Sequence, residues 1–244
     1  MQHHTEIWLA KVFNDNLPGL GNSILKILHL PTEARPWANF MVMELLVMVL
    51  IVVLFAILRP RLSVDRPGKL QQTFEVIYEF VIGQSGDVIG HGGEKFLSYF
   101  GSLFIFILIC NLIGIIPGLE SPTMAPSVTV GCAIATFVYY NVVGVAEHGP
   151  LRYAAHFAGP IWWLAWLMIP IEIVSHLARP LSLSVRLYAN MFAGEQVTLV
   201  FLGLTYLVAP AIFMGLHVFV SLLQAYIFML LSMMYVAGAV AHEH

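Results

Sequence analysis

The sequence predicts an all-α, polytopic membrane protein with five membrane-embedded helices and one interfacial amphipathic helix. Hydrophobic residues make up 59% of the 244 residues and charged residues only 10%. A soluble chain carries about 25% charged residues. The mean hydropathy is +0.84, and the apolar residues gather in runs long enough to cross a bilayer. The net charge of −3 carries little information, because the positions of the charges matter more than their sum.

The first part of the chain, residues 1–36, is predicted to be a short extracytoplasmic segment, because prolines and glycines interrupt it repeatedly. Residues 37–58 form the first spanning candidate, about 22 residues that match a hydrocarbon core of roughly 30 Å. Glu44 interrupts this apolar run. The carboxylate could be functional, could lie near the membrane interface or could face a neighbouring helix. The sequence leaves these three interpretations open.

A basic loop follows the first spanning candidate. Four of the eleven basic residues, Arg59, Arg61, Arg66 and Lys69, fall within a short stretch, which the positive-inside rule assigns to the cytoplasm. In residues 69–89 apolar side chains recur at helical spacing, while glutamine and glutamate take the other face. This segment is too polar to span a membrane, so it is predicted to be the interfacial amphipathic helix.

The remaining spanning candidates lie in the second half of the chain. Residues 96–117 and 126–146 are predicted to form a helical hairpin, whose link lacks lysine and arginine. A loop with one arginine, residues 147–159, separates the hairpin from two longer apolar stretches, 160–204 and 206–240. This alternation predicts an N-terminus outside and a C-terminus in the cytoplasm. The long stretches exceed the roughly 20 residues that a crossing needs, so each either breaks into a hairpin or is strongly tilted.

Arg186 is the most informative residue, because it lies within a long apolar stretch. An arginine near the middle of a bilayer costs roughly 2.5–3.5 kcal/mol or more, so it indicates a function. Unlike lysine, arginine cannot avoid this cost by losing its proton.

Helical periodicity separates the polar residues of this stretch into two groups. At about 100° per residue, Glu195 lies on the opposite face of the helix from Arg186 and roughly 13.5 Å along the axis. The two therefore cannot pair within the helix. In the last stretch His217 and Gln224 share a face, about 10.5 Å apart. The polar residues on the Arg186 face are Glu172, Arg179, Ser182 and Asn190.

Each of these residues also has a structural alternative. Arg186 could lock two helices together, Glu195 and His217 could form a satisfied buried pair, and Asn190 and Gln224 could join helices by hydrogen bonds. Protonatable groups that line a water path, however, are how proton relays are built inside membranes. Because these groups all fall in the last two stretches, proton transport is the chemistry that the residues favour.

Three runs of the chain resemble subunit a of the F-type ATP synthase. The most specific is Arg186-Leu-Tyr-Ala-Asn-Met-Phe-Ala-Gly-Glu195, within residues 172–195. The others are residues 217–228, from His217 to Phe228, and residues 111–117. The resemblance covers about three quarters of the chain and is weakest over residues 1–36.

This resemblance implies a fold and a role for each site residue. The two long terminal helices would lie strongly tilted against a rotating ring of c subunits. Arg186 matches the essential arginine, the catalytic position, which faces the ring carboxylate and keeps it ionised. The positions that match the half-channel open to the outer side are Glu195, His217, Asn190 and Gln224. The positions that match the path to the cytoplasm are Glu172, Ser182, Ser175 and His176. Asn111 matches a further polar position in the hairpin.

The resemblance also implies the setting. The partners would be the c-subunit ring, the peripheral-stalk b subunits and membrane lipid, and the transported ion would be the proton. The chain would lie in a bacterial inner membrane and would have no catalytic site of its own, being one component of an enzyme complex. No cofactor, metal, nucleotide or nucleic acid is expected on it.

Two departures from the family pattern affect the outer half-channel. Many relatives have a carboxylate where this chain has Gly114, and relatives often have acidic or amide residues where it has Ala125 and Ser127. Glu120 is a candidate to compensate for them.

Two other classes of protein compete with this interpretation. A proton-coupled secondary transporter, the main alternative, would show internal repeats, whereas the charged sites here cluster at one end of the chain. A membrane metalloenzyme is a weaker alternative, because the sequence has ten histidines but no His-Glu-x-x-His run.

Overall fold

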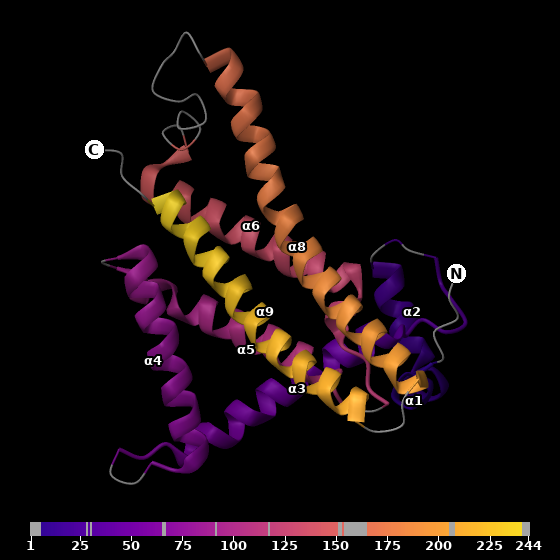
Figure 1. Ribbon diagram of the computed structural model, residues 1–244. Coiled ribbons are helices and arrows are strands. Elements are labelled where there is room, and N and C mark those ends of the chain that lie inside the picture. Colours follow the sequence, from indigo (N-terminus) through magenta and orange to yellow (C-terminus); the bar gives the residue numbers. More distant parts are fainter. Residues whose placement is uncertain are drawn as a thin grey trace.

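The computed structural model describes residues 6–27, 29, 31–64, 67–90, 92–116, 118–150, 153, 165–204 and 208–240. All regular structure in these ranges is helical, without a strand (Figure 1), which confirms the predicted all-α class. The α-helices are α1 (Trp8–Asn16), α2 (Pro18–Ile27), α3 (Asn39–Leu58), α4 (Lys69–Ile89), α5 (Leu97–Ile113), α6 (Pro126–His148), α8 (Ala165–Leu204) and α9 (Val208–Val240). Short 3-10 helices lie at Arg59–Arg61, Gly93–Phe96 and Pro122–Met124. Most of the predicted loop 147–159, with residues 160–164 and 205–207, lies outside the described residues.

Four helices in the described ranges are long and apolar enough to cross a membrane. They cover Asn39–Arg61, Gly93–Ile113, Pro126–His148 and Ala211–Val240. The predicted fifth member corresponds to α8, a single helix of 40 residues with Pro170 and Pro180 inside it. Its continuity excludes a break into a hairpin between residues 165 and 204. The count of five embedded helices and the tilt of the last two remain predictions.

The N-terminal segment contains two helices that the sequence analysis did not predict. Pro18 lies at the first position of α2, where its missing N–H has no helical partner to lose. The Asn14 side chain receives the backbone N–H of Trp37 at 2.9 Å and donates to the Trp37 carbonyl at 3.0 Å. These bonds attach α1 to the start of α3.

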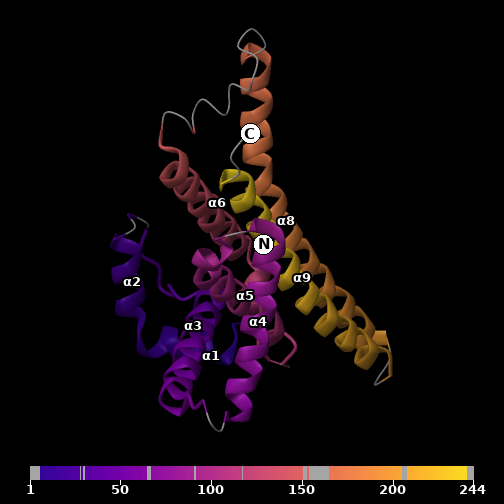
Figure 2. The same cartoon turned by 90° about the vertical axis from the view of Figure 1, so that its left-hand side faces the viewer.

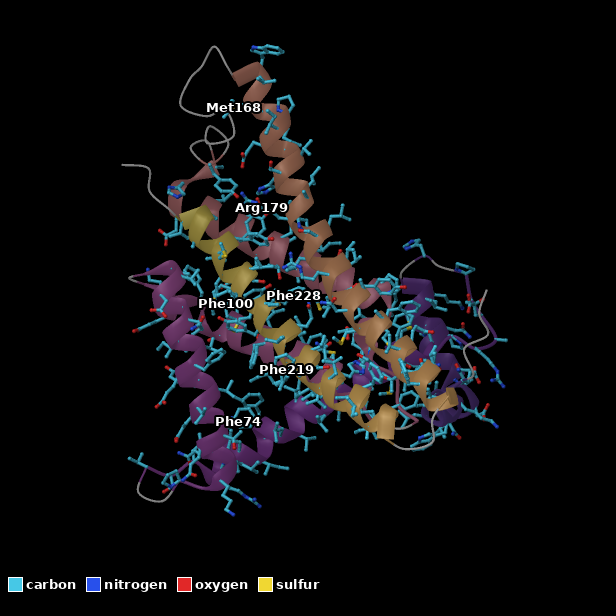
Figure 3. The ribbon with its side chains drawn as sticks, viewed as in Figure 1. Phe74, Phe100, Met168, Arg179, Phe219 and Phe228 are labelled. Atoms are coloured by element: carbon cyan, nitrogen blue, oxygen red, sulfur yellow. The ribbon has the colours of Figure 1, made fainter. Side chains whose placement is uncertain are left out.

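Helix α9 lies at the centre of the packing and contacts α4, α5, α6 and α8 (Figures 1 and 2). Its buried side chains include Phe228 and Met233, which meet Phe100 of α5 and Leu187 of α8 in one core (Figure 3). Between membrane helices such contacts stabilise by close packing, because lipid tails are as apolar as the core. The central position of α9 fixes the helices that carry the polar residues.

Helix α4 is amphipathic, with one face against α5 and α9 and the other exposed. The Gln71 side chain exchanges two 3.0 Å hydrogen bonds with the backbone of Ser63, and Tyr226 of α9 donates to Gln84 at 3.0 Å. These bonds attach both ends of α4 to its neighbours. Its placement at the membrane interface stays a prediction.

Gly114 ends α5 in close contact with the link to α6. A Cβ at this position would come within 2.7 Å of the Ser121 Cβ and 3.1 Å of the Ser121 backbone nitrogen. A side chain therefore has no room here, which gives a physical reason for the departure from the acidic family pattern.

We predict that Gly114→Ala destabilises the chain by about 1–3 kcal/mol, the usual cost of overpacking. The matched control is Gly101→Ala, because an added Cβ at position 101 meets nothing within 4 Å. The measurement is the temperature at which the subunit in the detergent-solubilised complex aggregates. An unchanged temperature for Gly114→Ala would contradict the close contact.

Candidate functional site

The site lies between α8 and α9, which pack against each other as an antiparallel pair (Figure 2). The Asn190 Nδ2 donates to the Gln224 Oε1 at 2.7 Å. Further along, the rings of Phe201 and Phe213 stack with centroids 4.1 Å apart. Residue numbers rise on one helix as they fall on the other, so the hydrogen bond sets the register of the whole contact.

His217 lies directly against α8 at Gly194, the residue before Glu195. A Cβ added to Gly194 would stand 3.3 Å from the imidazole Cδ2 and 3.4 Å from its Nε2. His217 is buried. Glycine at position 194 therefore makes the space in which the imidazole fits next to the residue that carries the carboxylate.

Three buried polar atoms on α8 and α9 lack a hydrogen-bond partner in the described part of the chain. They are the Glu195 Oε2, the His217 Nε2 and the Gln224 Nε2. Buried polar groups in proteins normally have partners, and leaving one unsatisfied costs about 1–3 kcal/mol. Such open positions on buried groups favour water as the partner, and they do not support the alternative of a satisfied Glu195–His217 pair.

Arg186 occupies a different face of α8. Its side chain is exposed, as are Ser182 and Ala189 one turn to either side. Among the described residues, no ion pair or hydrogen bond to the Arg186 guanidinium is found. The cation therefore stands on a surface of α8 that this chain does not cover, which does not support a lock between two helices of this chain.

The predicted residues nearer the start of α8 form a second polar region. Arg179 (Figure 3) lies 3.9 Å from Glu172. Its guanidinium lies 5.6 Å from the centroid of the Tyr235 ring. His176 is buried and lies 2.9 Å from the Asn141 Oδ1 of α6. Ser175 and Ser182 are exposed. The region thus joins α6, α8 and α9 but does not touch the Glu195 cluster.

Asn111 belongs to a buried network that the sequence analysis only partly identified. Thr123 donates to the Asn111 Oδ1 at 2.7 Å, and the Asn111 Nδ2 donates to the Ser221 carbonyl of α9 at 3.4 Å. Ser121 donates to the Cys110 carbonyl at 2.8 Å. The short polar side chains of Ser121 and Thr123 in the link of the hairpin could have indicated this network from the sequence. The network fastens this link to α5 and α9.

Asn141 and Tyr140 of α6, which the sequence analysis did not single out, contact His176 in the second polar region. The Tyr140 hydroxyl lies 3.3 Å from the His176 Nε2, and Tyr153 donates to the Asn141 Oδ1 at 3.0 Å. An asparagine inside an otherwise apolar stretch was a usable signal, because such residues join helices in membranes.

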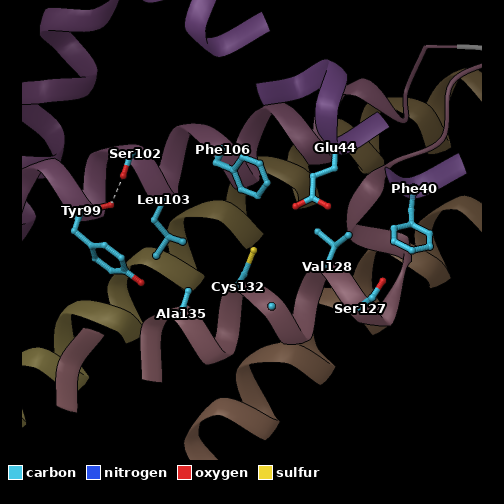
Figure 4. A pocket seen from close by; sticks show the side chains of 11 residues that line it. Phe40, Glu44, Tyr99, Ser102, Leu103, Phe106, Ser127, Val128, Cys132 and Ala135 are labelled. Atoms are coloured by element: carbon cyan, nitrogen blue, oxygen red, sulfur yellow. Dashed lines mark hydrogen bonds between the residues drawn. The ribbon is translucent and has the colours of Figure 1, made fainter. Parts of the chain in front are cut away.

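Glu44 faces a cavity of about 460 Å³ between α3, α5 and α6 (Figure 4). Tyr99, Cys132 and Ser127 line the same cavity. Of the three interpretations of Glu44 that the sequence leaves open, the structure favours the one in which the carboxylate faces neighbouring helices. The cavity is separate from the Glu195 cluster.

The sequence matches the family described as ATP synthase A chain over residues 41–237. It is 68% identical over 233 residues to ATP synthase subunit a of Solibacter usitatus, an alignment that covers 96% of this chain and 100% of that protein. It is 47% identical over 241 residues to ATP synthase subunit a of Koribacter versatilis, covering 98% of each, and 39% identical over 219 residues to that of Trichlorobacter lovleyi, covering 90% and 94%. The chain therefore belongs to the F-type ATP synthase subunit a family and is a multi-pass membrane component of that complex.

Proposed function

We propose that this chain is the stator subunit that conducts protons through two offset half-channels, which load and unload the carboxylates of a c-subunit ring on either side of Arg186. The observation that carries this proposal is the separation of polar groups on α8. Glu195, with a buried carboxylate oxygen that lacks a partner in the described residues, lies on the opposite face of α8 from Arg186, which is exposed and has no partner in those residues.

The exposed face of α8 around Arg186 suits a ring of helices. Ser182, Ala189 and Ala193 are small and exposed, and small residues let the backbone of another membrane helix approach closely. Leu181 and Val185 supply apolar surface beside them. A ring carboxylate that passes this face would meet a permanent positive charge at low dielectric, which favours its ionised form.

The same charge prevents a proton from crossing directly between the two half-channels. A proton that leaves Glu195 for the opposite face would have to approach the guanidinium, and like charges repel strongly in a medium of low dielectric. The outer half-channel contains Glu195, His217, Asn190 and Gln224. Asn111 of α5 belongs to the same half-channel and contacts the backbone of α9 at Ser221. The cytoplasmic half-channel contains Glu172, Ser182, Ser175 and His176.

The proposed setting follows from the family. The chain lies in a bacterial inner membrane with its N-terminus outside and its C-terminus in the cytoplasm, and it contacts the c-subunit ring and the peripheral-stalk b subunits. Nucleotide chemistry takes place on other subunits. Membership of the subunit a family favours this role over a secondary transporter.

We predict that Arg186→Ala abolishes ATP-driven proton uptake by inverted vesicles that carry the assembled complex, because no charge then releases the ring proton. Arg61→Ala is the control, since Arg61 is exposed on the 3-10 helix after α3 and should pump normally. Immunoblots of subunit a in the membrane establish that the complex is assembled. Normal pumping by assembled Arg186→Ala would refute the proposal.

We predict that Glu195→Gln lowers the same uptake by about 100-fold, the lower end of the range for removing an acid–base group. The amide keeps the shape of the side chain but cannot carry the proton. Glu79→Gln serves as control, because Glu79 is exposed on α4. If Glu195→Gln pumps at the wild-type rate, Glu195 does not belong to the path.

A further inference from the structure

A cavity of about 680 Å³ lies between the N-terminal segment, the α5–α6 link and α8. Its charged and amide side chains come from three separate parts of the chain. They are Glu6, Arg35, Asn39 and Glu120. Glu6 forms an ion pair with Arg35, and Glu120 is the second carboxylate of the lining.

Glu120 is held at the cavity by a chain of hydrogen bonds from the N-terminal segment. The Asn39 Nδ2 donates to the Glu120 Oε2 at 3.2 Å. The backbone N–H of Ile7 donates to the Asn39 Oδ1 at 3.2 Å. The oxygen and the nitrogen of the Asn39 amide thus each form a hydrogen bond, and together the two bonds orient the nitrogen toward the Glu120 carboxylate.

Ser121, the residue after Glu120, is held by hydrogen bonds within the α5–α6 link and to α5. Ser121 is buried and bonded to the Cys110 carbonyl and to Thr123, which holds Asn111. Asn111 in turn reaches the backbone of α9. Because these groups are buried and paired, the backbone at Glu120 has a defined position relative to α9.

Helix α8 places Glu195 on the side of this cavity. Tyr188 and Phe192 line the cavity, and Glu195 follows them at helical spacing, within about 60° on the same face. Arg186 lies on the opposite face from Glu195. The carboxylates of Glu120 and Glu195 are also near enough to interact electrostatically.

We propose that Glu120 collects protons at the mouth of the outer half-channel and passes them toward Glu195, with Asn39 as its positioning residue. This inference rests on the proposed function. In each cycle the Glu120 carboxylate takes a proton from a hydronium ion or a buffer acid. It then releases that proton to water in the cavity, from which Glu195 takes it, and Glu120 returns to the carboxylate form.

The test measures ATP synthesis driven by a pH jump in inverted vesicles, whose interior corresponds to the outer side. In dilute interior buffer, Glu120→Gln should lower the synthesis rate by about tenfold, the lower end of what local charge achieves in concentrating an ion. Concentrated imidazole inside the vesicles should restore the rate to within about twofold of wild type, because a small acid then delivers protons directly. Asn39→Ala should show a smaller loss with the same recovery.

The matched control is Glu33→Gln, because Glu33 is exposed in the same N-terminal segment and does not line the cavity. It should equal wild type in both buffers. A wild-type rate for Glu120→Gln in dilute buffer would overturn the inference. A loss that imidazole does not restore would also overturn it, because that loss is structural.

Arg186→Ala in the same assay separates this inference from the proposed function. If Arg186→Ala synthesises ATP, the proposed function fails. If Arg186→Ala is inactive while Glu120→Gln equals wild type, only the role of Glu120 fails.

Discussion

The hydrogen bond from Asn190 to Gln224 is the contact on which the arrangement of the polar groups depends. It joins the two longest helices at 2.7 Å between the exposed Asn190 and the buried Gln224, and such amide bonds join helices in membranes. With this register fixed, His217 falls opposite Gly194, the residue that precedes Glu195. A shift of one residue would rotate these side chains away from each other by about 100°.

The period of the α-helix then places the two principal charged residues of α8 on different faces. Arg186 and Glu195 are nine residues apart, which puts them on opposite faces of one continuous helix. Glu195 lies on one face, and one of its carboxylate oxygens is buried and lacks a partner in the described part of the chain. The other face leaves a permanent charge exposed. In the proposed function these faces serve different half-channels, so the rigidity of α8 keeps the two paths apart.

The sequence predicted what depends on local periodicity. The helical class, the long stretches of α8 and α9, and the opposite positions of Arg186 and Glu195 all follow from apolar spacing and about 3.6 residues per turn. It did not predict contacts between distant segments. The bond from Asn39 to Glu120 joins residues 81 positions apart, and the bond from Asn111 reaches 110 positions to Ser221. Such pairs depend on how helices pack, which a single sequence does not specify.

The proposed function requires two water paths that do not join, one reaching Glu195 and the other reaching Ser182, on different faces of α8. It is tested by labelling vesicles that carry the assembled complex with a membrane-impermeant thiol reagent, added from either side. Cys110 and Cys132 are first replaced by alanine, and Glu195→Cys or Ser182→Cys is then introduced. We predict that position 195 is labelled only from the outer side and position 182 only from the cytoplasmic side. Labelling of both positions from the same side, or of either one from both sides, would contradict it.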